Sequence, residues 1–321
     1  MKTVFTRILC GAALALSALA AAAQPYPGKP IRIIVYVGPG TLVDVTARVV
    51  AEKLAETLGQ PVVVENMPGA GGLLGIRHVK NAPADGYTLL AATNTVAMAP
   101  VLTAAPGYEL KDFTAVGGMN RAPFVMVGPV GQPAKSLAEL IANAKANPNT
   151  LTFASGGVGT TTYLAASMFL HQAGVKMLHV PYKGTGAAMP DVIGGRVNMM
   201  FDAENSTAPH IRDGRLRAFG MSSATRSKGL PNVPTIAEQG LAGFNFSIFN
   251  AVMVRAETPP AIVQRLSEAL NAAIRSDAVQ ERFRRDGSEP FVIAPSELNE
   301  FVRKEQLRIQ KVATDMGMEK Q

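Results

Sequence analysis

The sequence has almost no cysteine. Of its 321 residues only Cys10 is a cysteine, and it lies in the Ala-rich N-terminal segment. If that segment is removed after export, thiol catalysis, disulfide bonds and cysteine-ligated zinc or iron–sulfur sites are excluded. A folded protein without disulfides depends on its packed core, and 47% hydrophobic residues are enough to form one.

Motifs of catalysis and of nucleotide binding are also missing. The sequence contains no G-x-S-x-G, no S-x-x-K and no P-loop, and in the Gly-rich stretch 68–72 the last glycine of a dinucleotide fingerprint would fall on Leu74. The four histidines are scattered without metal-ligand spacing. We therefore expect no enzymatic activity, no cofactor and no metal site.

Tryptophan is absent, and no block of Lys or Arg occurs. The net charge is +7, and it becomes +5 without Lys2 and Arg7, because Lys+Arg falls from 31 to 29 while Asp+Glu stays at 24. Without a basic block or interleaved aromatic residues, this surplus does not indicate nucleic-acid binding.

The N-terminus has the pattern of a signal peptide. Lys2 and Arg7 precede a short apolar run over 8–20, and Ala21 and Ala23 fit a cleavage site that leaves Gln24 first. A transmembrane anchor is the alternative, but this run is short and rich in alanine. We expect cleavage after residue 23 and a periplasmic protein.

After the signal, short β-branched segments alternate with Ala- and Leu-rich helical patterns. This order predicts an α/β fold with two doubly wound domains and a ligand cleft between them. Domain 1 is expected to be discontinuous, over 24–125 and 246–321, and domain 2 to cover 126–245. The predicted elements include helices Leu42–Leu58, Leu73–Asn81 and Thr235–Gln239 and a strand Phe124–Val127.

Five loops that follow predicted strands are rich in Gly, Ser, Thr and Asn. They are Gly38–Asp44, Thr93–Thr95, Ser155–Thr162, Tyr182–Gly186 and Asp202–Ser206. Ligands of open parallel sheets bind beyond the carboxyl ends of the strands, and helix N-termini attract anions. Simple turns with helix caps are the alternative explanation for each loop.

These residues carry a resemblance to a known family. The chain resembles the periplasmic substrate-binding proteins of tripartite tricarboxylate transporters, the Bug family. The matching segments are YPGKPIRIIV (26–35), GQPVVVENMPGAGG (59–72), APADGYTLL (82–90), HVPYKGTG (179–186), HIRDGRLRA (210–218), LPNVPTIAEQG (230–240) and TPPAIVQRL (258–266). They cover nearly the whole chain after the signal, in the family's order.

The resemblance implies an extracytoplasmic receptor that binds a small organic carboxylate between its domains and delivers it to membrane transporter subunits. We expect a monomer. The implied ligand-binding residues are Tyr36, Gly38, Gly40, Thr41, Asp44, Thr93, Asn94, Ser155, Gly157, Gly159, Thr160, Thr161, Tyr182, Lys183 and Asp202.

The sequence departs from the family pattern in two loops. Tyr36 and Thr41 replace a proline and a glycine, and Val158 and Tyr163 replace an asparagine and a histidine. These changes favour a carboxylate with an apolar or aromatic body. A sensor that docks on a membrane signalling partner, and an exported enzyme that acts on organic acids, remain alternative functions.

Overall fold

The computed structural model describes residues 26–318 and residue 320. The predicted signal peptide, Cys10 and Gln24 lie outside the described residues. In the part that is described, every helix is too short or too polar to cross a bilayer.

The chain begins with a parallel sheet, as the alternating pattern predicts. β1 (Ile31–Val35) lies between β2 (Val62–Asn66) and β3 (Thr88–Ala92) and pairs in parallel with both. Helices α2 (Leu42–Leu58) and α3 (Leu73–Asn81) connect them, with the predicted bounds. Gly59 ends α2 because its φ of 68° is accessible to glycine.

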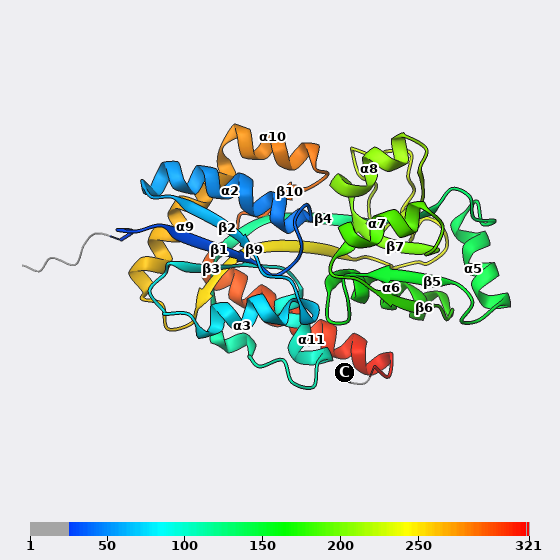
Figure 1. The fold of residues 1–321 in the computed structure, drawn as a ribbon, viewed down its shortest axis with the longest axis horizontal. Helices are drawn as coiled ribbons and strands as arrows, with labels where there is room; N and C mark the ends of the chain where they lie inside the picture. The colour runs from blue at the N-terminus through cyan, green and yellow to red at the C-terminus, as the bar shows by residue number, and fades with distance from the viewer. Residues whose placement is uncertain (1–25, 319, 321) are drawn as a thin grey trace, which may run out of the picture.

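One long strand, β4 (Phe113–Pro129), joins this sheet to a second one. It pairs antiparallel with β9 (Ser247–Arg255) as far as Pro123, and with β7 (Met199–Ala203) from Phe124 onward. β9 lies between β3 and β4, so the sheet is mixed. Figure 1 shows β4 and β9 running side by side between the two halves of the molecule.

The second group of strands is again parallel. β5 (Thr152–Ser155) lies between β7 and β6 (Leu178–Pro181), while β8 (Leu216–Met221) pairs antiparallel with β4. We call the strands β1–β3, β9, the β4 segment 113–123 and the short β10 (Glu289–Pro290), with their helices, the first lobe. The β4 segment 124–129 and β5–β8, with their helices, form the second lobe. The proposed domain boundaries at 125/126 and 245/246 stay a prediction.

Helices cover both faces of each lobe. The remaining helices are α4 (Thr95–Leu102), α5 (Leu137–Ala146), α6 (Thr161–Ala173), α7 (Thr185–Ile193), α8 (Glu204–Arg212), α9 (Pro260–Arg275), α10 (Asp277–Arg285) and α11 (Pro295–Asp315). In the first lobe α2, α9 and α10 share one apolar core, and α3, α4 and α11 pack on the opposite face. This is the layered α/β arrangement that the sequence predicts.

Two local predictions differ from the structure, and three helices were not predicted. The predicted helix Thr235–Gln239 is wrong, because the segment forms turns in which Ile236 donates its N–H to Met221 O at 2.9 Å. The strand predicted at Phe124–Val127 is only the last part of β4, whose Gly117–Gly118 pair masks the pattern. The sequence pattern did not indicate α4, which contains Pro100, nor did it indicate α8 and α10.

Candidate functional site

Four of the five predicted loops, together with the junction of β7 and α8, come together where the two lobes meet. The predicted loop Asp202–Ser206 is wrong, because β7 runs directly into α8 at Glu204. The Thr161 hydroxyl at the start of α6 lies 3.3 Å from the Thr93 hydroxyl and 3.4 Å from that of Thr95, which follow β3. A Cβ on Gly38 would lie 3.4 Å from the carbonyl oxygen of Lys183. The lobes are therefore in contact across the site.

A small cavity lies at this contact, and we call it the threonine cavity. Its volume is about 60 Å³. Its lining residues come from both lobes and include Thr41, Thr93, Thr95, Thr160, Thr161, Thr162 and Thr185, with apolar walls from Leu42, Val43, Phe124 and Ile248. Among the described residues that line it, none is a Lys, Arg or His, and Asp202 alone carries a charge. Hydroxyl and backbone N–H groups are thus the donors offered to an anion.

Tyr36 ties the end of β1 to the end of β3. Its hydroxyl lies 2.6 Å from the Thr93 hydroxyl and accepts the Thr93 N–H at 2.9 Å. Burial raises the pKa of Tyr36 to about 12, so the phenol stays neutral. The residue lines the cavity and positions Thr93, and its contact with a ligand stays a prediction.

The Thr160 hydroxyl makes its hydrogen bonds at the start of its own helix, α6. It donates to Gly157 O at 2.6 Å and accepts from the Tyr163 N–H, which makes Thr160 the N-cap of α6. The next residue, Thr161, is 5% exposed and has its hydroxyl among the threonines of the other lobe. Of the two predicted residues, Thr161 therefore has the hydroxyl that is available to a ligand.

Asp202 is a buried carboxylate in the wall of the cavity. One oxygen accepts from the Thr185 hydroxyl and the Ala203 N–H, both at 2.9 Å, and the other accepts from the Ser206 hydroxyl at 2.6 Å. Burial raises the pKa of Asp202 above its ordinary value, although these three donors oppose the shift.

Asp44 supports the first loop from behind. Its carboxylate accepts from the Gly40 N–H at 2.9 Å, from Asn66 at 2.9 Å and from the Arg48 guanidinium at 3.0 Å. Burial opposes the charge, but these hydrogen bonds outweigh it and lower the pKa of Asp44. Asp44 and Gly40 do not line the cavity and instead fix the loop that carries Thr41.

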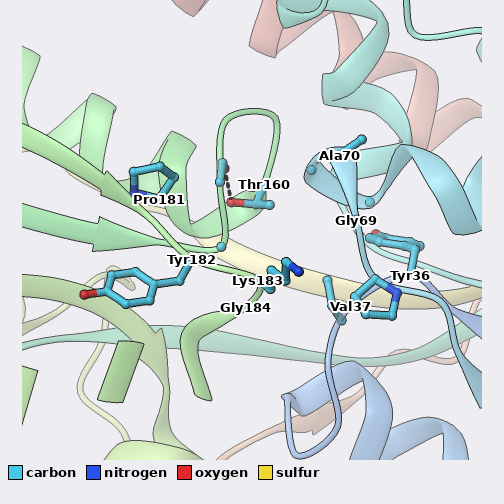
Figure 2. A pocket seen from close by; sticks show the side chains of 14 residues that line it. Tyr36, Val37, Gly69, Ala70, Thr160, Pro181, Tyr182, Lys183 and Gly184 are labelled. Carbon is cyan, nitrogen blue, oxygen red and sulfur yellow. Dashed lines mark hydrogen bonds between the residues drawn. The ribbon is translucent and has the colours of Figure 1, made fainter. Parts of the chain in front are cut away.

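A second space of about 290 Å³ adjoins the threonine cavity and shares Tyr36 and Thr160 with it (Figure 2). The turn 68–72, Gly157 and the segment 181–184 complete its walls, and we call it the glycine pocket. Figure 2 shows Lys183 in this pocket and the Tyr182 ring pointing away. The Tyr182 hydroxyl donates to Asp191 at 2.7 Å, so only the backbone of this predicted residue is near a ligand.

Other predicted residues lie outside both spaces. Asn94 accepts the Phe249 N–H at 3.1 Å and faces the opposite side of β9. The Ser155 hydroxyl lies 2.7 Å from His179 Nε2 beneath the loop. Gly38 and Gly159 shape the loops without lining a cavity; a Cβ on Gly159 would lie 3.6 Å from the Thr103 hydroxyl.

The Ser155–His179 pair was not expected from the sequence. Ser155 is fully buried, its oxygen also accepts the Gly157 N–H, and the His179 ring packs against Phe153 and Tyr163. Burial lowers the pKa of His179. Neither residue lines the threonine cavity or the glycine pocket, and the buried pair holds the loop that follows β5.

Sequence reasoning missed several lining residues. Phe124 and Ile248 belong to strands that connect the lobes, and no local signal marks them. The turn 68–72 was noticed only as a failed dinucleotide fingerprint, although its glycines were a usable signal. Val158 and Tyr163, the departures expected near the ligand, line neither the threonine cavity nor the glycine pocket. Over residues 26–318 and 320, no three His, Cys, Asp or Glu side chains form a potential metal site.

Comparisons with known proteins show which family and which fold the chain resembles. The family model described as "Tripartite tricarboxylate transporter family receptor" matches residues 46–318. Protein BugT of Bordetella pertussis is 37% identical over 319 residues, which are 97% of this chain and 98% of that protein.

Two solved structures from Rhodopseudomonas palustris have the same fold. Rpa4515, solved with adipate, is 30% identical with a TM-score of 0.88 and covers 92% of this chain and 100% of its own. MatC, solved with bound malate, is 30% identical with a TM-score of 0.85 and covers 89% and 99%. Because the similarity extends over most of the chain, the protein has the α/β architecture of periplasmic binding proteins.

Proposed function

Because the chain belongs to the tripartite tricarboxylate transporter receptor family, we propose that it binds one small organic carboxylate between its lobes and delivers it to the membrane subunits of a transporter. The observation that carries this proposal is the threonine cavity, where hydroxyls from both lobes lie within 3.4 Å of one another. A carboxylate placed among them receives hydrogen bonds from both lobes at once.

The proposed binding residues are those that meet in the two spaces. Thr93 and Thr161 offer hydroxyls, Tyr36 positions Thr93, and the N-terminus of α6 favours negative charge. Thr41 lines the same cavity, and its hydroxyl donates to Gly38 O at 3.0 Å. Phe124 and Ile248 give the cavity an apolar wall, which supports a ligand with an apolar body. Two structural neighbours were solved with the dicarboxylates adipate and malate, which supports an acid of this size.

Opening of the lobes is part of the proposal. A space of about 60 Å³ is smaller than the roughly 300–1,000 Å³ of ordinary ligand pockets, so a carboxylate enters only when the lobes separate. Closure around the ligand then gives the transporter a shape that differs from that of the empty receptor.

A thermal-shift screen over mono-, di- and tricarboxylates, aromatic acids included, tests the function. We expect at least one acid to raise the melting temperature, because a ligand that binds only the folded state stabilises it. Calorimetry should then give one site per chain, and NMR should recover the acid unchanged. Absence of any shift, or steady conversion of the acid, would overturn the receptor function. Mass spectrometry of the periplasmic protein tests the predicted loss of residues 1–23.

A further inference from the structure

A large cavity lies on the other side of the strands that join the lobes. Its volume is about 1100 Å³, and it is lined by segment 223–229 of the second lobe and by segment 284–289 and α11 of the first lobe. We call it the hinge groove. The proposed function makes no use of it.

The hinge groove and the threonine cavity share a wall. Phe124 and Ile248 line the threonine cavity, while Pro123, Ser247 and Phe249 line the groove, and Ile248 contributes to both. The wall therefore consists of β4 and β9, at the point where the chain passes between the lobes. A rotation of the lobes about these strands widens one space as it narrows the other.

The lining of the groove carries more positive than negative side chains. Five are basic, Arg121, Arg226, Lys228, Arg284 and Arg308, and two are acidic, Glu289 and Glu305. Three of the basic groups are paired with carboxylates, Arg226 with Glu238, Arg284 with Glu281 and Arg308 with Glu305. Among the described residues, Arg121 and Lys228 have no ion pair within 4.0 Å.

Arg121 is held in place without an acceptor. Its guanidinium carbon lies 3.7 Å from the centre of the Phe291 ring and 4.6 Å from that of Phe301. Within residues 26–318 and 320, its guanidinium donates no hydrogen bond. Partial burial lowers its pKa, against the attraction of Glu305, whose two oxygens are occupied by Arg308. A fixed, partly desolvated cation of this kind is costly alone and gains from an added anion.

Glu289 is the carboxylate that competes for this position. It lies opposite Arg121 where β10 pairs with β4. Among the described residues, no ion pair within 4.0 Å joins these two side chains. The Glu289 side chain is exposed and lines the same groove. Removal of the Glu289 charge should therefore favour the binding of an external anion beside Arg121.

We propose that the hinge groove is a second anion site, which takes a small multivalent oxyanion between Arg121 of the first lobe and Lys228 of the second, and that its occupation opens the threonine cavity. A small anion that contacts both flanks of a 1100 Å³ groove draws them together. Because the two spaces share a wall, this movement separates Thr161 from Thr93 and Thr95 on the other side. The coupling rests on the proposed carboxylate receptor function, whereas binding in the groove does not.

Inorganic pyrophosphate is the probe for this site, since it has two charged ends and is not a carboxylate. We expect it to bind the carboxylate-free protein in calorimetry. We also expect it to weaken the affinity for the best acid of the screen about tenfold, within the usual range of coupling between sites, and to reach a plateau. Sodium chloride at equal ionic strength is the control for screening.

Two double variants separate the groove from general charge effects. Arg121→Gln with Lys228→Gln should abolish pyrophosphate binding and the coupling, while affinity for the acid alone stays unchanged. Arg215→Gln with Lys176→Gln removes the same charge from surfaces outside the groove and should behave as wild type. Glu289→Gln should tighten pyrophosphate binding.

The remaining outcomes overturn the proposal. Absence of pyrophosphate binding contradicts it directly. A loss of acid affinity that grows without a plateau and persists in the Arg121/Lys228 variant means competition in the threonine cavity instead. If no acid binds at all, the proposed function fails, and pyrophosphate calorimetry on the two double variants still tests the groove.

Discussion

In this site, a residue that caps a helix and a residue that faces the ligand space are neighbours in the sequence. Thr160 and Thr161 are neighbours in a loop of Gly and Thr, but the first caps α6 and the second points to the other lobe. The strand-end rule predicted the loop and not this division, because the direction of each side chain depends on where the helix begins. The strand-end rule also predicted Asn94 and Tyr182 as ligand-binding residues. In the structure Asn94 accepts from Phe249 and Tyr182 donates to Asp191, so both side chains point away from the two cavities.

Thr161→Val tests the hydroxyl that faces the cavity. A hydrogen bond to a charged group contributes about 1.5–3 kcal/mol, so we expect carboxylate affinity to fall roughly 10- to 150-fold. Thr160→Val should instead destabilise the protein by about 1 kcal/mol through loss of the cap. Calorimetric titration and urea denaturation of both variants measure the difference. Equal affinity of Thr161→Val and wild type would show that this hydroxyl does not touch the ligand.

Asp202→Asn tests the buried carboxylate. Because burial raises the pKa of Asp202 in the folded protein, this group favours folding at low pH, and that contribution is lost as pH rises through its folded pKa. An asparagine at this position does not ionise, so its contribution to stability is not lost as pH rises. Its side-chain oxygen can still accept the hydrogen bonds from Thr185 and Ala203. We expect the stability of the variant relative to wild type to be greater at about pH 8 than at about pH 4, as measured by urea denaturation. A difference that does not change with pH would contradict this.

At the scale of elements, helices with clear ends were predictable and strands that pass between lobes were not. α2 and α3 have the predicted bounds because Gly59 and the glycines before Leu73 mark their ends. β4 contains glycines and Pro123, which suit a strand that bends from one sheet into another but weaken the sequence pattern. The wall between the two spaces was therefore absent from the sequence-based prediction.

The turn 68–72 closes against the second lobe, and a matched pair of glycine variants tests this contact. A Cβ on Gly71 would lie 2.3 Å from Val158 O, whereas at Gly59 it would meet nothing within 4 Å. Their φ values, 64° and 68°, are similar, so alanine costs about 1–2 kcal/mol of backbone strain at either position. We expect Gly71→Ala to weaken carboxylate binding at least about tenfold. Gly59→Ala should lower the melting temperature alone, and similar affinity of the two variants would rule out closure at Gly71.

For the whole molecule, the α/β class and the layered helices followed from the sequence pattern because each strand and helix buries an apolar face. The joint between the lobes did not follow from it, since β9 pairs with β3 and β4 across more than a hundred residues of chain. No local periodicity in the sequence indicates a pairing between strands so far apart in the chain.

Cooperative unfolding is the prediction that belongs to this scale. β4 contributes buried residues to the cores of both lobes, so neither lobe can lose its packing without disturbing the other. Scanning calorimetry of the ligand-free protein should give one transition, with a ratio of calorimetric to van't Hoff enthalpy of about 1. Two resolved transitions would show that the lobes unfold separately.

The position of β9 also sets the order in which the chain can fold as it is made. The first lobe has a gap between β3 and β4 until Ser247–Arg255 has been synthesised, and α9 and α11, which cover its two faces, come later still. Contacts between such distant segments form slowly. A chain proposed for export must reach the membrane before it is compact, and this topology delays compaction until nearly the whole chain has left the ribosome.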